Sequence, residues 1–129
     1  MNAIFHVKPT ALIGVSAQAG AFSEEVVREM SRLNEKPLIF ALSNPTSKAE
    51  CSAEQAYTWS NGTCIFASGS PFDEVTLPDG KHFVPGQGNN SYIFPGVGLA
   101  AVTVGPRRID DHDFIIAAEA LAAQVYIIM

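Results

Sequence analysis

Three short apolar runs constrain the fold of this chain more than any other feature of its sequence. They are Ala11–Ser16, Leu38–Ser43 and Cys64–Ser68, and none alternates between apolar and polar residues. Continuous apolar runs of this length are typical of strands that are buried on both faces of a parallel sheet. We therefore predict three parallel strands with flanking helices.

Helical patterns fill the intervals between these runs. A first helix should begin after Ser23, whose hydroxyl can cap it, and should end before Pro37. Ser52 and Gln55 have the spacing of a capping box, which predicts a short helix through Trp59. The resulting order β-α-β-α-β predicts the α/β class, as a partial Rossmann-like, doubly wound parallel sheet.

The rest of the chain follows a different pattern. The turn residues Pro78–Gly80 lie between two short apolar runs and predict a hairpin, and Pro85–Asn90 is a polar, glycine-rich loop. For Ser91–Val104 we predict a helix whose glycines allow close packing against the sheet. Asp110 and Asp111 should then cap an amphipathic helix that ends the domain.

Composition indicates a folded domain. The chain has 129 residues, of which 47% are hydrophobic and only 16% charged, which excludes intrinsic disorder. Its net charge of -5 argues against nucleic acid as a partner. No apolar run approaches the roughly 20 residues of a membrane helix, so we expect no membrane partner. Without a visible targeting segment we expect the cytoplasm, or the mitochondrion if such a segment is missing.

The two cysteines, Cys51 and Cys64, are too few for a disulfide framework and lack the spacing of a zinc site. We expect both to be reduced packing residues. The three histidines are scattered, the acidic clusters fit solvated surface and helix capping, and neither a GxGxxG fingerprint nor a Walker lysine is present. The residues alone therefore show no convincing catalytic acid, base or metal site.

Polar segments follow each predicted strand, at the edge where ligands bind in open parallel sheets. Asn44 stands out because its neutral amide can both donate and accept hydrogen bonds. The alternative is an Asx-turn, in which this amide bonds only the backbone of its own turn. The loop Gly86–Asn90 offers two further amides beside glycines that permit close approach of a ligand. Its alternative is a tight turn in which Asn90 or Ser91 caps the next helix.

Several strings taken together resemble one family, the NAD(P)-dependent malic enzymes. The resemblance runs through the segments Lys8–Val15, Phe40–Thr46, Phe66–Phe72 and Pro85–Asn90, in the order of the family. It covers residues 7–125, which we expect to form part of the NAD(P)-binding domain, with residues 1–6 and 126–129 as tails outside the match. The strings SNPT, ASGSPF and PGQGNN in this order are highly specific.

The resemblance implies roles for residues whose spacing left them undecided. Asn44 and Asn89 match asparagines that contact the substrate L-malate, and Asn44, Ser16 and Ala17 would contact the cofactor, NAD or NADP. The family oxidises malate by hydride transfer and then releases CO2 to give pyruvate, with Mg2+ or Mn2+ bound.

The family residues that perform this chemistry precede the matched region. They are a lysine base, a tyrosine acid, a Glu-Asp-Asp metal triad and the glycine-rich fingerprint. We therefore expect a malic-enzyme fragment that is inactive alone and that carries no catalytic or metal-ligating residue. The alternative is a stand-alone module that binds a nucleotide or dicarboxylate without catalysis. Half of a doubly wound sheet leaves apolar surface without the elements that would cover it. We therefore also expect the chain to self-associate into a homo-oligomer.

Overall fold

The structure, a computed structural model, describes residues 2–128, and the side chains of residues 3–124. Met1 and Met129, which the sequence analysis assigned to the tails, lie outside the described residues. The chain divides into two compact units, residues 1–88 and residues 89–129. Each unit is described by itself.

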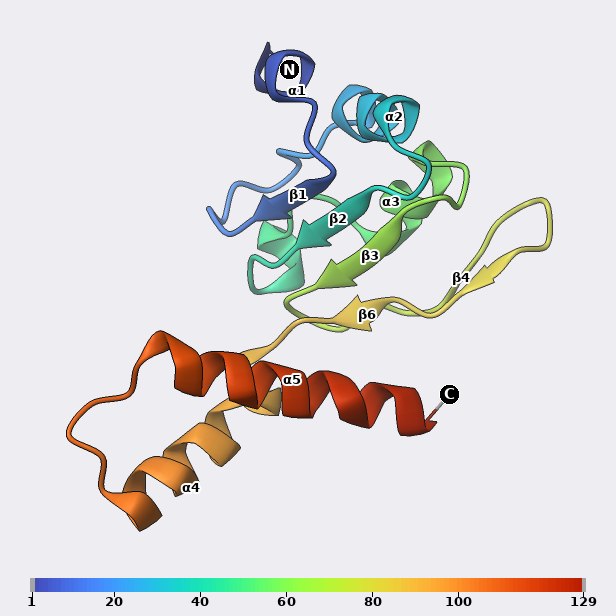
Figure 1. The fold of residues 1–129 in the computed structure, drawn as a ribbon. Coiled ribbons are helices and arrows are strands. Elements are labelled where there is room, and N and C mark those ends of the chain that lie inside the picture. The colour runs from blue at the N-terminus through green and yellow to red at the C-terminus, as the bar shows by residue number, and fades with distance from the viewer. Residues whose placement is uncertain (1, 129) are drawn as a thin grey trace. The chain divides into compact units, whose positions relative to one another are not determined.

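A four-stranded parallel sheet forms the centre of the first unit (Figure 1). Its order is β1 (Ala11–Gly14), β2 (Leu38–Ala41), β3 (Ile65–Ser68) and β6 (Gly86–Gln87). The prediction of a parallel α/β sheet is thereby confirmed. The fourth strand corrects the prediction of a loop at Pro85–Asn90, since Gly86 pairs with Ala67 and Gln87 with Ser68. No apolar side chain marks this strand, so periodicity could not reveal it.

Helices α2 (Glu24–Leu33) and α3 (Ala53–Trp59) form the two crossovers between these strands. The predicted capping box is confirmed: Ser52 Oγ accepts from Gln55 N, and Gln55 Oε1 accepts from Ser52 N. The predicted cap at Ser23 is wrong in one respect, because its side chain makes no capping hydrogen bond. Glu24 and Glu25 lie in the first turn of α2, where a negative charge stabilises the helix by its interaction with the positive end of the helix dipole.

Only one face of the strands is deeply buried within this unit, which corrects the expectation of burial on both faces. Ile39 and Phe66 are 0% and 4% exposed, whereas Ile13 and Ile65 are 58% and 51% exposed. The cause is topological. Both crossovers run in the same direction along the sheet, and right-handed crossovers then place both helices on the same face. Accordingly α2 and α3 pack against each other and share one core with Ile39 and Phe66.

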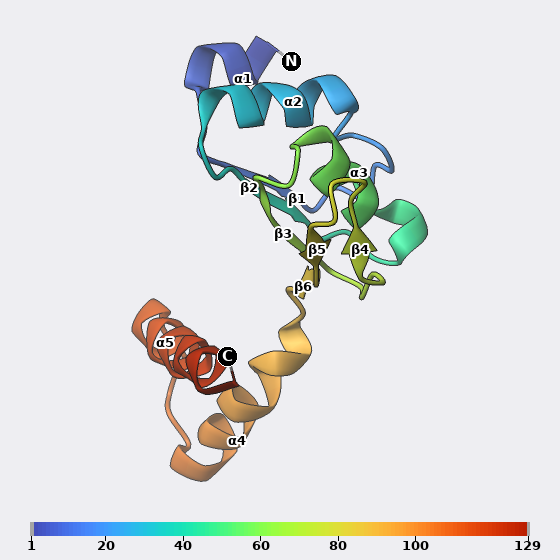
Figure 2. The same ribbon diagram turned by 90° about the vertical axis from the view of Figure 1, so that its right-hand side faces the viewer.

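Two further elements complete the first unit. Helix α1 (Asn2–Val7) lies beside α2 and buries Ile4 in the core, although the sequence analysis assigned residues 1–6 to a tail. One inward apolar residue in six is too little to form a helical pattern. The predicted hairpin is confirmed as β4 (Val75–Thr76) and β5 (His82–Phe83), which lies beside α3 (Figure 2).

The second unit consists of helices. A 3-10 turn, η2 (Asn90–Tyr92), precedes α4 (Phe94–Val104) and α5 (Asp111–Ile128), which confirms both predicted helices. A Cβ added at Gly96 or Gly98 would meet no atom within 4 Å, so these glycines are not sites of close packing within the second unit. That they pack against the sheet stays a prediction.

Helix α5 is capped as predicted, because Asp110 Oδ1 accepts from His112 N and Asp113 Oδ2 accepts from Asp110 N. Its predicted amphipathic character is wrong. The adjacent residues Phe114, Ile115 and Ile116 are each at least half exposed, and successive positions point about 100° apart around a helix. Among the helices of residues 2–128, none is long and apolar enough to cross a bilayer.

Candidate functional site at the carboxyl edge of the sheet

The carboxyl ends of three strands lie in one row. Gly14 pairs with Ala41, and Ala41 pairs with Ser68, so β1, β2 and β3 end side by side. The segments that leave this edge are those that the sequence analysis singled out, beginning at Val15, Leu42 and Gly69. Open parallel sheets bind ligands at this edge, because the backbone diverges there and exposes polar groups.

Asn44 is an exposed residue at this edge and precedes a cis peptide bond to Pro45. The hydroxyl of Ser70 donates to Asn44 Oδ1 at 2.5 Å, although 26 positions separate the two residues. The amide also lies close to Gly69, where an added Cβ would be 2.6 Å from Asn44 Oδ1. The turn after β2 and the turn after β3 are thus joined through the Asn44 side chain.

A buried carboxylate, Glu50, organises the same edge from below. Glu50 is 1% exposed, and its Oε1 accepts from Ser43 Oγ at 2.5 Å. The Ser43 hydroxyl in turn accepts from the backbone N–H of Ala17 at 2.9 Å. A chain of hydrogen bonds therefore runs from Glu50 through Ser43 to the loop after β1, and Ser43 is the residue directly before Asn44.

Two backbone contacts reinforce this anchoring. Gly20 N donates to Ala49 O at 3.3 Å, and Phe22 N donates to Glu50 O at 3.0 Å. Gly14 leaves the room that the carboxylate needs, since a Cβ there would lie 2.4 Å from Glu50 Cδ. Sequence reasoning missed Glu50 because its only signal was a carboxyl group within a polar stretch, and nothing local indicates burial.

The structure thus brings Ser16, Ala17 and Asn44 together at one edge, on adjoining loops. Ser16 and Ala17 are exposed, and Ala17 has a φ of 56°, a left-handed conformation that costs about 1 kcal/mol for a residue with a Cβ. The N–H of Ala17 is already engaged by Ser43. Any ligand contact of this loop therefore uses atoms other than that amide.

Asn89 belongs to the second unit and is half-buried. Its side chain accepts from Ser91 N at 2.9 Å and caps η2. The alternative prediction for this loop was a tight turn that caps the next helix. Such a cap is present, but the capping residue is Asn89 and not Asn90 or Ser91. In the first unit, Gly88 N donates to Ser68 O at 2.8 Å, which fixes the chain directly before Asn89.

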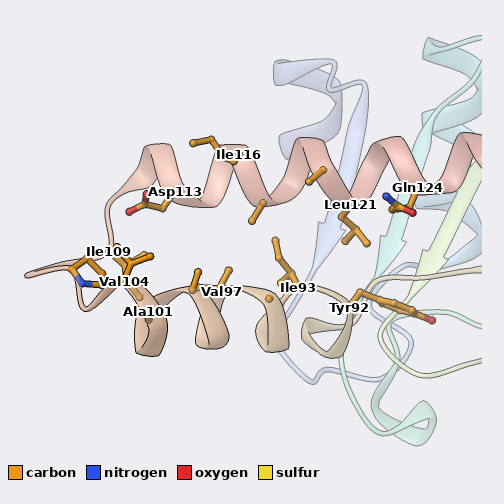
Figure 3. Close-up of a pocket in the computed structure, with 15 residues that line it drawn as sticks. Tyr92, Ile93, Val97, Ala101, Val104, Ile109, Asp113, Ile116, Leu121 and Gln124 are labelled. Atoms are coloured by element: carbon orange, nitrogen blue, oxygen red, sulfur yellow. The ribbon is translucent and has the colours of Figure 1, made fainter.

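A cavity in the second unit lies between α4 and α5 and has a volume of about 560 Å3 (Figure 3). Apolar side chains such as Ile93, Val97 and Leu121 line it, and Asp113 and Gln124 are its charged and amide-bearing residues. This cavity lacks the convergent polar groups of a substrate site. Within residues 2–128 no cluster of three His, Cys, Asp or Glu side chains has a geometry suited to a metal ion.

Cys51 and Cys64 are free and buried, which confirms that both are packing residues. Burial raises the pKa of the Cys51 thiol to about 12, with smaller contributions from Cys64 and Glu50. Burial also raises the pKa of Cys64. Neither thiol has the lowered pKa of a reactive cysteine.

We expect the native chain to resist alkylation at pH 8. Iodoacetamide should leave Cys51 unlabelled in buffer and label it rapidly in 8 M urea, because only the unfolded thiol, with a pKa of about 8.5, ionises there. By linkage, the raised pKa contributes stability that is complete below about pH 8.5 and is lost as pH rises toward 12. Labelling of the folded chain at the rate of a small thiol, read by mass spectrometry, would contradict this prediction.

Comparison with known proteins indicates the family of this chain. The family model described as "Malic enzyme, NAD binding domain" matches residues 1–127. The chain is 63% identical over 119 residues to the NADP-dependent malic enzyme of Mus musculus, covering 92% of this chain and 21% of that relative. The identity is 63% with the Homo sapiens enzyme and 60% with its mitochondrial counterpart.

The chain spans about one fifth of the length of the curated relatives that it matches. The family model nevertheless covers nearly all of the chain, and the matched description agrees with the parallel sheet and its helices. The chain belongs to the malic enzyme family.

Proposed function

We propose that this chain forms part of the cofactor domain of a malic enzyme that converts L-malate to pyruvate and CO2 by oxidative decarboxylation. The observation that supports this most is the exposed Asn44 amide at the carboxyl edge, beside the loop that carries Ser16 and Ala17. We propose that residues 7–125 form this part of the cofactor domain.

The donor set at this edge fits the nicotinamide end of a cofactor better than its phosphates. Asn44 and Ser16 offer a neutral amide and a hydroxyl group, which suit a carboxamide and sugar hydroxyls. When bound, the nicotinamide accepts the hydride from C2 of malate. We propose NADP as the cofactor, because the matched relatives from Mus musculus and Homo sapiens are named NADP-dependent.

In this proposal Asn44 orients malate and the nicotinamide, and Asn89 bonds a carboxylate or hydroxyl of malate. Neutral amides hold an anion in place without adding charge, and correct placement of two reactants supplies much of an enzyme's rate enhancement. Ser43 and Glu50 hold the adjoining loops. The side chains of the described residues form no cluster that fits a divalent metal.

We further propose that the isolated chain associates with itself. Val102 and Val104 on α4 are 85% and 76% exposed, and exposed apolar side chains of this kind support self-association.

For the cellular location we propose the cytoplasm. This is in keeping with relatives whose names carry no compartment, although one human relative is named mitochondrial.

A graft tests the proposed function. In it, this chain's sequence replaces the matching 119-residue segment of the Mus musculus enzyme. With malate, Mn2+ and NADP+ the graft should form NADPH, read at 340 nm, whereas the 129-residue chain should form none. An inactive but folded graft would contradict the proposal. Heat of NADP+ binding to the chain in calorimetry, without turnover in the graft, would favour a binding module.

A further inference from the structure

The turn after β3 is held rigidly below Asn44. Gly69 N donates to Ala41 O at 3.2 Å, and Gly69 O accepts from Gln87 Nε2 at 3.3 Å. Ser68 Oγ donates to Ser70 O at 2.8 Å. The N–H and the carbonyl of Gly69 and the carbonyl of Ser70 are therefore all hydrogen-bonded. These bonds hold the backbone from which the Ser70 side chain extends.

The Ser70 hydroxyl has one proton, and it donates this proton to Oδ1 of Asn44. An amide has one acceptor and one NH2 group on opposite sides, so a donor that engages Oδ1 determines where Nδ2 points. The flat amide also lies close against Gly69, where a Cβ would be 2.6 Å from Oδ1 and 2.9 Å from Nδ2. The Asn44 side chain is thus held on one face and at one end.

We propose that Ser70 is a positioning residue that orients the Asn44 amide so that Nδ2, and not Oδ1, faces the ligand. The inference rests on the proposed function, in which Asn44 contacts the ligand. It adds the chemical class of the group that Asn44 meets: a hydrogen-bond acceptor, such as a carboxylate oxygen of a dicarboxylate or a carboxamide oxygen. A ligand group that can only donate would find no acceptor there.

Kinetics of the graft test this inference. Ser70→Ala should lower kcat/KM for malate about tenfold, the effect of one lost hydrogen bond, while the thermal midpoint stays within a degree or two. Ser70→Thr keeps the hydroxyl and should restore most of the loss. Ser31→Ala is the matched control, because Ser31 Oγ donates to Val27 O on α2 and its loss should leave kinetics unchanged.

The Asn44→Asp variant distinguishes the role of the acceptor Oδ1 from the role of the donor Nδ2. Aspartate still accepts from Ser70 but carries no NH2 group, so this variant should be more impaired than Ser70→Ala. In the Asn44→Asp background, Ser70→Ala should add little further loss, since both changes remove the same donor from the ligand.

The outcomes distinguish this inference from the proposed function. If Asn44→Ala is impaired and Ser70→Ala is not, the positioning role is wrong and the proposed function stands. If Ser70→Ala costs the same factor with and without Asn44, Ser70 acts on its own and the inference is overturned. If the graft is active and Asn44→Ala is unimpaired, the proposed site fails, and this inference fails with it.

Discussion

Gly69→Ala is expected to destabilise the 129-residue chain by about 3 kcal/mol or more. A Cβ at this position would lie 2.2 Å from the carbonyl oxygen of Leu42, far inside van der Waals contact. That oxygen belongs to the backbone directly after β2, which cannot move without breaking the pairing of β2 with β3. The strain must therefore be relieved by partial loss of the sheet.

Urea unfolding followed by circular dichroism measures this effect. The variant should unfold at a much lower urea concentration or should fail to fold. Gly96→Ala is the matched control, since it makes the same chemical change inside α4, where an added Cβ meets no atom within 4 Å. Alanine favours helix over glycine by about 1 kcal/mol, so the control should be neutral or stabilising. Equal midpoints for Gly69→Ala and the unsubstituted chain would show that the close contact is absent.

Much of this fold could be predicted from the sequence because its signals are local. The runs at Ala11, Leu38 and Cys64 became three parallel strands, and Ser52 with Gln55 became a capping box. Strand β6 could not be predicted, because Gly86 and Gln87 carry no apolar pattern and only their pairing with β3 makes them a strand.

Burial also escaped sequence reasoning, because a side chain's surroundings depend on distant elements. Ile13 belongs to an apolar run, yet it is 58% exposed, since the crossover helices both lie on the other face. Glu50 carries a carboxyl group, yet it is buried beneath Gly14 and bonded to Ser43.

The candidate site was predictable only in part. The residues after the strands could be placed at one edge from topology alone, and Asn44 was among them. Its link to Ser70 spans 26 positions and required coordinates. The roles of Asn44, Asn89, Ser16 and Ala17 remain predictions that rest on the family resemblance.

Asn44→Ala is expected to have the largest effect on activity without an effect on stability. Asn44 is exposed, and its side chain accepts a hydrogen bond from Ser70 at the surface, so the loss of this side chain should cost little folding free energy. In the graft, removal of one well-placed donor to an anionic substrate should lower kcat/KM about 100-fold. Asn34→Ala should behave in the opposite way. The Asn34 amide donates to Pro9 O and Met30 O near the amino ends of the strands, which indicates a structural role.

The most direct test of the account compares these two variants in one graft, by NADPH formation at saturating NADP+ and by thermal unfolding. We predict that Asn44→Ala loses about 100-fold in kcat/KM for malate at an unchanged midpoint, whereas Asn34→Ala keeps its activity and melts at a lower temperature. An Asn44→Ala graft that turns over malate as fast as the unsubstituted graft would contradict the assignment of this edge as a substrate site.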